Sequence, residues 1–113
     1  MRKVLVVDDE FLVRVGIKSF LNWEENGYTI IGEAADGKQA LEIMERELPD
    51  VVLTDLKMDG MDGFELIQVS RKRFPAVQFV VLSSFEDGEN VKRAMKLGAA
   101  DYIFKLTSKP EEL

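Results

Sequence analysis

The chain has 113 residues, the length of a single domain, and its 46% hydrophobic and 32% charged residues suit a globular protein. Its net charge of −6 argues against direct nucleic-acid binding, which requires a basic face. The absence of cysteine and histidine excludes disulfides, thiolate metal sites, the usual zinc sites and Ser-His catalysis, so a metal bound here must be a hard cation with oxygen ligands.

The first half of the chain predicts two strands, each followed by a helix. Residues 3–7 form an apolar strand, which is too short for a signal-peptide core or a membrane span, so the cytoplasm is the expected location. Residues 28–34 form the second strand. Asp36 and Gln39 fit a capping box that begins a helix ended by Pro49. The two helices are predicted from apolar stripes at helical spacing: Val13, Gly16, Ile17, Phe20 and Leu21, then Ala40, Leu41, Met44 and Leu48.

The second half continues the alternation. Strands are predicted at 50–55, 77–82 and 100–104, and Pro75 ends the helix that follows the first of them. Gly98 suits the left-handed position after the next helix, and a capping box at Ser108 predicts the start of a fifth helix. The helices after the third and fourth strands are predicted from residues that share one packing face. These residues are Gly63, Phe64, Ile67, Ser70 and Phe74 in the first helix, and Val91, Ala94 and Met95 in the second.

Strands and helices that alternate at this spacing predict an α/β fold of three layers, with helices on both faces of a five-stranded parallel sheet. Right-handed crossovers place the carboxyl ends of all strands at one edge, where open sheets of this class bind ligands. Because the fifth helix is truncated, residues 1–113 are expected to be one domain of a longer protein.

Polar residues stand at the carboxyl ends of four predicted strands. Asp8 and Asp9 follow the first strand, Asp55 ends the third, Ser83 follows the fourth and Lys105 follows the fifth. Three carboxylates crowded at one edge repel one another, and a divalent cation would remove that conflict. With only oxygen ligands on offer, the sequence predicts Mg²⁺.

A carboxylate beside Mg²⁺, with a lysine and a hydroxyl nearby, suits phosphoryl transfer. Asp55 can attack phosphorus and carry an acyl phosphate, while the cation and Lys105 offset charge on the phosphoryl oxygens. The Ser83 hydroxyl can donate a hydrogen bond to the phosphoryl group once it is present, which would couple the reaction to a movement of its loop.

The order and spacing of four motifs resemble the receiver domains of two-component response regulators over the whole chain. These motifs are Val6-Val7-Asp8-Asp9-Glu10, Thr54-Asp55-Leu56-Lys57-Met58 with Met61-Asp62-Gly63, Leu82-Ser83, and Asp101-Tyr102-Ile103-Phe104-Lys105. The resemblance implies the doubly wound, flavodoxin-like strand order 2-1-3-4-5.

The resemblance also implies roles for individual residues. Asp55 is the expected phosphoacceptor. Asp9 is the expected direct Mg²⁺ ligand, assisted by Asp8, Asp55 and the backbone carbonyl of Lys57. Ser83 matches the switch hydroxyl, Tyr102 the switch aromatic and Lys105 the lysine of the phosphate site, with Ser84 next to the phosphate.

Three residues depart from the family pattern. Asp59 stands where the family usually has proline, Ser84 replaces a smaller residue, and Leu106 replaces a proline that follows a cis peptide bond. A cis bond before a residue other than proline costs about 3 kcal/mol. The Lys105–Leu106 bond is therefore expected to be either trans with a rearranged loop or cis with strain.

The resemblance implies a sensor histidine kinase as phosphoryl donor and an output domain that binds DNA. The loop at residues 23–28 is similar to receivers whose output is an AraC-type pair of helix-turn-helix motifs. A homodimer is expected through the face of the fourth helix, fifth strand and fifth helix, near Val91, Met95, Tyr102 and Phe104, although core packing is the preferred role of Val91 and Met95.

Two alternatives remain open. One is a receiver-like interaction module that no longer accepts phosphate, which Leu106 keeps possible. The other is a phosphatase with an aspartate nucleophile, resembling the haloacid dehalogenases. That family has a second aspartate two residues after the nucleophile, where this chain has Lys57.

Overall fold

A computed structural model describes residues 1–20, 22–84 and 88–104. The elements alternate along the chain, and their bounds are β1 (Arg2–Val7), α1 (Phe11–Phe20), β2 (Tyr28–Ala34), α2 (Gly37–Arg46), β3 (Val51–Asp55), α3 (Gly63–Arg73), β4 (Gln78–Ser83), α4 (Gly88–Leu97) and β5 (Asp101–Phe104). In these ranges no helix is both long enough and apolar enough to pass through a lipid bilayer.

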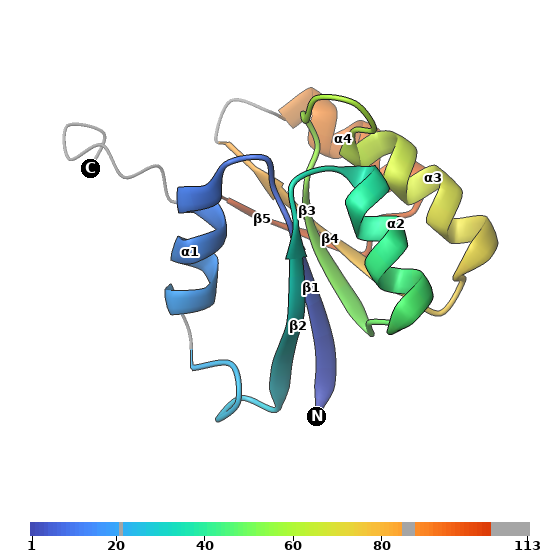
Figure 1. Ribbon diagram of the computed structural model, residues 1–113. Coiled ribbons are helices and arrows are strands. Elements are labelled where there is room, and N and C mark those ends of the chain that lie inside the picture. The colour runs from blue at the N-terminus through green and yellow to red at the C-terminus, as the bar shows by residue number, and fades with distance from the viewer. Residues whose placement is uncertain (21, 85–87, 105–113) are drawn as a thin grey trace, which may run out of the picture.

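The five strands form one parallel sheet in the order β2-β1-β3-β4-β5, which confirms the doubly wound, flavodoxin-like fold. Figure 1 shows α1 on one face of the sheet and α2, α3 and α4 on the other. The register between β1 and β2 shifts between Val4 and Leu5, so that Leu5 pairs with Gly32 and Ile31 is left out. The predicted fifth helix lies outside the described residues.

Among the described residues, the hydrophobic cores on the two faces of the sheet differ in size. Alternate residues of β1 point to opposite faces, as they must in a strand. Leu5 and Val7 join the larger core under α2, α3 and α4, whereas Val4 and Val6 join a smaller one with Leu53. Trp23 and Tyr28 pack against the smaller core, and the Trp23 indole N–H donates to the carbonyl of Ile17 at 3.1 Å.

The predicted helix faces are confirmed in part, with corrections at four residues. Gly16, predicted on the apolar face of the first helix, is exposed, and Leu21 of the same face lies outside the described residues. Phe20 was expected in the core but is 70% exposed, since it is the last residue of α1. Leu48 is also exposed, because α2 ends at Arg46, before the turn that leads to Pro49. Met95 is 39% exposed, so the core role preferred for it was wrong. Val91 is buried as expected.

Candidate functional site

The register of the sheet brings the carboxyl ends of β1, β3 and β4 side by side. Val7 pairs with Thr54, and Asp55 pairs with Leu82. Asp8 therefore comes next to Asp55, and Ser83 is the last residue of β4, one residue beyond the partner of Asp55. The structure thus brings these three predicted site residues to one edge of the sheet.

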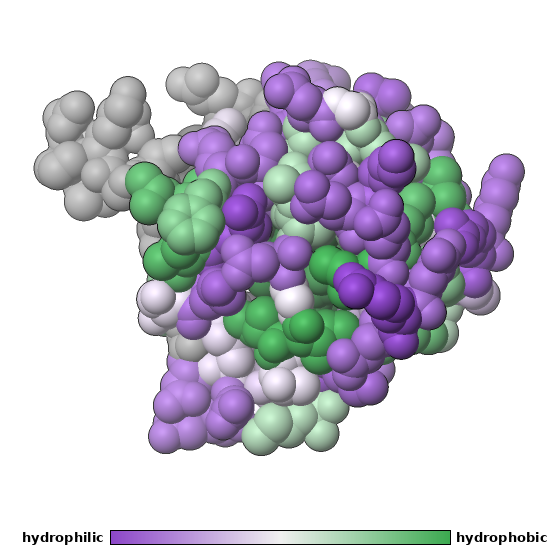
Figure 2. Space-filling model, viewed as in Figure 1, coloured by the Kyte–Doolittle hydropathy of each residue, from purple (hydrophilic) through white to green (hydrophobic). Residues whose placement is uncertain are grey.

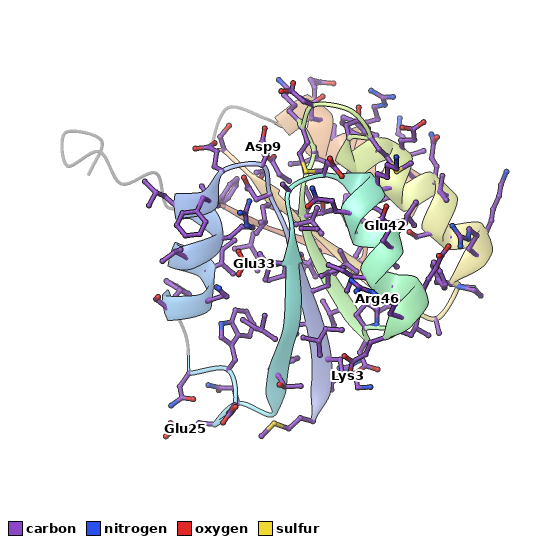
Figure 3. All side chains as sticks on the ribbon, viewed as in Figure 1. Lys3, Asp9, Glu25, Glu33, Glu42 and Arg46 are labelled. Carbon is purple, nitrogen blue, oxygen red and sulfur yellow. The ribbon has the colours of Figure 1, made fainter. Side chains whose placement is uncertain are left out.

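An acidic turn follows β1. The carboxylate oxygens of Asp8, Asp9 and Glu10 lie within 4.8 Å of one another. Asp8 is fully buried, and its Oδ1 accepts a hydrogen bond of 2.9 Å from the Glu10 amide, which closes the turn. Figure 3 shows Asp9 where the chain leaves β1 toward α1. Glu10 was not among the predicted metal ligands, although its place in a run of three acids was a signal for it.

The carboxylate of Asp55 is oriented by the backbone that follows it. Asp55 Oδ1 accepts a hydrogen bond of 2.7 Å from the Leu56 amide, and the Lys57 amide lies 3.5 Å from the same oxygen. Asp55 is half-buried, as a group that must meet an external reactant requires. The hydroxyl of Thr54 donates to the Asp55 carbonyl at 2.8 Å, which fixes the end of β3.

Gly63 allows the start of α3 to pack directly against the Asp55 turn. Its amide donates to the Leu56 carbonyl at 3.0 Å. A Cβ atom at this position would lie 2.2 Å from the Asp55 carbonyl oxygen and 2.8 Å from the Leu56 Cα. Only glycine fits such a close approach of two backbone segments.

An open cavity of about 330 Å³ lies beside the acidic turn and is lined by Asp9, Lys57, Met58, Asp59 and Asp62. Asp9 and Lys57 are predicted site residues. Asp62 was seen in the sequence only as part of a motif, and it also caps α3, since its Oδ1 accepts from the Glu65 amide at 2.9 Å. A carboxylate at a helix N-cap is a pattern with a common structural role, which is why it did not point to the site.

Ser83 is 1% exposed, and its hydroxyl oxygen has no hydrogen-bond partner among the residues that the structure describes. A buried hydroxyl left in this state costs roughly 1–3 kcal/mol. Ser84 is half-buried next to it. A hydrogen-bond acceptor carried by the Asp55 carboxylate would therefore remove this cost at the Ser83 hydroxyl.

Tyr102 lies on β5, apart from the acidic turn. Its side chain is 42% exposed and packs edge-on against Phe104, with ring centroids 5.4 Å apart. Lys105, predicted to reach the phosphate, lies outside the described residues, and so does the Lys105–Leu106 bond, whose cis or trans state stays a prediction. Ser83 pairs with Phe104 across β4 and β5.

One carboxyl group near the acidic turn has a shifted pKa. Hydrogen bonds from Lys18 and from Arg14 stabilise the charged form of Glu33 and hold the pKa of its carboxyl below the ordinary value, against a smaller opposing effect of burial. Arg14 Nε lies 2.7 Å from Glu33 Oε1. Glu33 thus keeps its negative charge beside the first turn of α1 at neutral pH.

The donor set fits Mg²⁺. The acidic turn offers only carboxylate oxygens, close enough together for one ion, and the cavity beside it leaves space for water ligands. Mg²⁺ prefers one or two carboxylates, several waters and a phosphoryl partner. A half-buried carboxylate, an acidic turn and a buried hydroxyl meet at one sheet edge, the arrangement expected of the class of proteins that receive phosphoryl groups.

Comparison with known proteins supports this class. The chain matches the response regulator receiver domain profile over residues 4–113. It is 43% identical over 105 residues to the uncharacterized transcriptional regulatory protein YesN of Bacillus subtilis, covering 93% of this chain and 28% of that protein. It is 42% identical over 106 residues to the response regulator protein VraR of Staphylococcus epidermidis, covering 94% of this chain and 50% of that protein.

A solved structure agrees as well. The receiver domain of AraT, a response regulator from Geobacillus stearothermophilus, superposes with a TM-score of 0.86 at 33% identity, covering 98% of this chain and 85% of that one. The chain belongs to the response regulator receiver domain family of two-component systems. It spans half or less of the length of the two relatives YesN and VraR.

Proposed function

We propose that the chain is a phosphorylation-dependent signal receiver in which Asp55 accepts a phosphoryl group from a sensor histidine kinase. The observation that carries the proposal is a buried hydroxyl, that of Ser83, one residue beyond the β4 partner of Asp55. Among the described residues, Ser83 Oγ has no hydrogen-bond partner, and β3 and β4 run in register up to Asp55. A phosphoryl oxygen on Asp55 would give that hydroxyl an acceptor.

The proposed reaction is one displacement at phosphorus. A carboxylate oxygen of Asp55 forms a bond to phosphorus while the P–N bond of the kinase phosphohistidine breaks, and the imidazole leaves and takes up a proton. The Leu56 amide holds Asp55 Oδ1 in place during the attack. The product is an acyl phosphate, and the chain acts as an acceptor that assists its own phosphorylation rather than as an enzyme with an external substrate.

The residues proposed to hold Mg²⁺ are Asp9, Asp8, Asp55 and Lys57, the last through its backbone carbonyl. The ion, when bound, offsets charge on the phosphoryl oxygens. Asp9 and Lys57 line the same cavity, which supports this assignment. Lys105 and Tyr102 are assigned to charge neutralisation and to the switch by the resemblance alone.

The wider role of the protein belongs to the same proposal. Residues 1–113 are proposed to form one receiver domain of a longer response regulator whose output domain binds DNA. The name of YesN, a transcriptional regulatory protein, supports such an output. The AraC-type output and the cytoplasmic location remain predictions.

The direct test is intact-mass spectrometry after incubation with acetyl phosphate and Mg²⁺. The expected result is one added phosphoryl group on the wild-type chain and none on Asp55→Asn or in the presence of EDTA. No adduct on the wild type from either acetyl phosphate or a histidine kinase would contradict the proposal and favour the interaction module that no longer accepts phosphate.

A further inference from the structure

A network of three charged side chains lies beside the acidic turn and takes no part in the proposed chemistry. Arg14 and Lys18 are four residues apart on α1, one helical turn, and both donate to Glu33 on β2. Arg14 Nε contacts Glu33 Oε1 at 2.7 Å, and Lys18 Nζ contacts Oε2. Figure 3 shows Glu33 projecting from β2 toward α1.

Arg14 makes one contact that Lys18 lacks. Its Nη1 donates a hydrogen bond of 2.6 Å to the backbone carbonyl of Asp8. The guanidinium also lies over the ring of Phe11, 5.6 Å from its centroid, and the Arg14 side chain is only 14% exposed. Three contacts, with the turn after β1, with β2 and with α1, therefore fix the guanidinium against the turn that carries Asp8 and Asp9.

We propose that Arg14 is a positioning residue for the cation site. It holds the Asp8 carbonyl, and thereby fixes the turn that presents the Asp8 and Asp9 carboxylates, while Glu33 anchors the guanidinium. This inference rests on the proposed function, because it names a residue that sets the Mg²⁺ affinity of the same site.

Removal of Arg14 should change the Mg²⁺ affinity in opposite directions, depending on whether Arg14 acts through its charge or through its contact with the turn. A positive charge near a cation site weakens cation binding by Coulomb repulsion, so loss of charge alone would strengthen it. Loss of a positioning contact would weaken it, as removal of groups that orient metal ligands typically costs 10–100-fold in affinity. The sign of the change therefore distinguishes the two roles.

Lys18 is the matched control. It carries the same charge, lies on the same helix and pairs with the same carboxylate, but its contact within the described part of the chain is to Glu33 and not to Asp8. Lys18→Met therefore removes one positive charge and leaves the hydrogen bond from Arg14 to Asp8 in place.

The experiment is a Mg²⁺ titration of the 113-residue chain, followed through amide shifts in ¹H–¹⁵N NMR spectra. Arg14→Met is expected to weaken Mg²⁺ binding roughly tenfold, at the lower end of the effect for such groups. Arg14→Lys should also weaken it, because an ammonium lacks the fork that spans Glu33 and Asp8. Lys18→Met should leave the affinity unchanged or slightly raised.

A second measurement separates positioning from general damage to the fold. Urea unfolding checks that each variant is folded, and Arg14→Lys replaces Arg14→Met if the latter is not. At saturating Mg²⁺ the phosphorylation rate of the Arg14 variant should return to that of the wild type, since only the cation affinity is affected. A rate that stays low at saturating Mg²⁺ would overturn the inference.

Failure of the positioning role and failure of the proposed function give different results. If the wild type binds Mg²⁺ and Arg14→Met binds it as tightly as Lys18→Met does, the positioning role is wrong and the proposed function stands. If the wild-type chain itself shows no Mg²⁺ binding, the cation site of the proposed function is wrong, and the role of Arg14 falls with it.

Discussion

Asp55 lies where β3 ends and two amides of the following turn approach its carboxylate. Its neighbours Asp8 and Ser83 were predictable from the sequence, because each stands at the carboxyl end of an apolar run and parallel strands meet at one edge. Glu10 and Asp62 were harder to assign, since their positions depend on the direction of a turn and not on strand periodicity.

Gly63→Ala is expected to disturb the turn that follows Asp55. The added Cβ would lie 2.2 Å from the Asp55 carbonyl oxygen, where only backbone can yield. We expect a loss of about 1–3 kcal/mol in the free energy of unfolding, typical of overpacking, together with slower phosphorylation of Asp55. Urea unfolding and intact-mass time courses measure the two effects.

Gly16→Ala provides the control for Gly63→Ala. Gly16 lies within α1 with no atom within 4 Å of an added Cβ, so alanine should stabilise the chain by about 0.5–1 kcal/mol. If Gly63→Ala behaved like Gly16→Ala, the close approach of α3 to the Asp55 turn would be wrong.

The secondary-structure elements follow closely from the sequence where a pattern and an end signal agree. Asp36 accepts from the Gln39 amide at 2.8 Å, as the capping box predicts, and Gly98 adopts a φ of 113° after α4. Phe20 and Leu48 are exposed at or beyond helix ends, because periodicity does not tell where packing against the sheet stops, and Met95 is exposed within α4.

The N-caps of α2 and α3 give a matched pair of variants. Asp36→Ala and Asp62→Ala each remove a side chain that accepts a backbone amide, and each should lower the free energy of unfolding by about 1 kcal/mol. Only Asp62 also lines the cavity beside the acidic turn, so only Asp62→Ala should weaken Mg²⁺ binding. Equal weakening by Asp36→Ala in the same titration would contradict this reading of the cavity.

At the scale of the whole molecule, the strand order follows from the family resemblance, whereas the parallel sheet follows from the alternation of elements. Figure 2 shows an apolar patch over α1 that includes Phe11, Leu12 and Val15. A second exposed apolar group lies on α4 and β5, at Met95, Tyr102 and Phe104.

The group on α4 and β5 is the proposed homodimer face. We expect the molar mass from light scattering to double when acetyl phosphate and Mg²⁺ are added to the wild-type chain. The Met95→Glu variant should stay monomeric, because dimerisation would bury its charge. The Met95 side chain is 39% exposed. Leu12→Glu, on the exposed patch of α1, is the control and should still dimerise. The reverse result would assign the interface to α1.

Asp55 is proposed to be the one residue that carries the phosphoryl group. This assignment is tested most directly by borohydride reduction of the phosphorylated chain, which converts an aspartyl phosphate to homoserine, followed by peptide mapping in a mass spectrometer. We expect homoserine at position 55 and at no other aspartate. Homoserine at Asp8, Asp9 or Asp59, or an unchanged yield in Asp55→Asn, would contradict it.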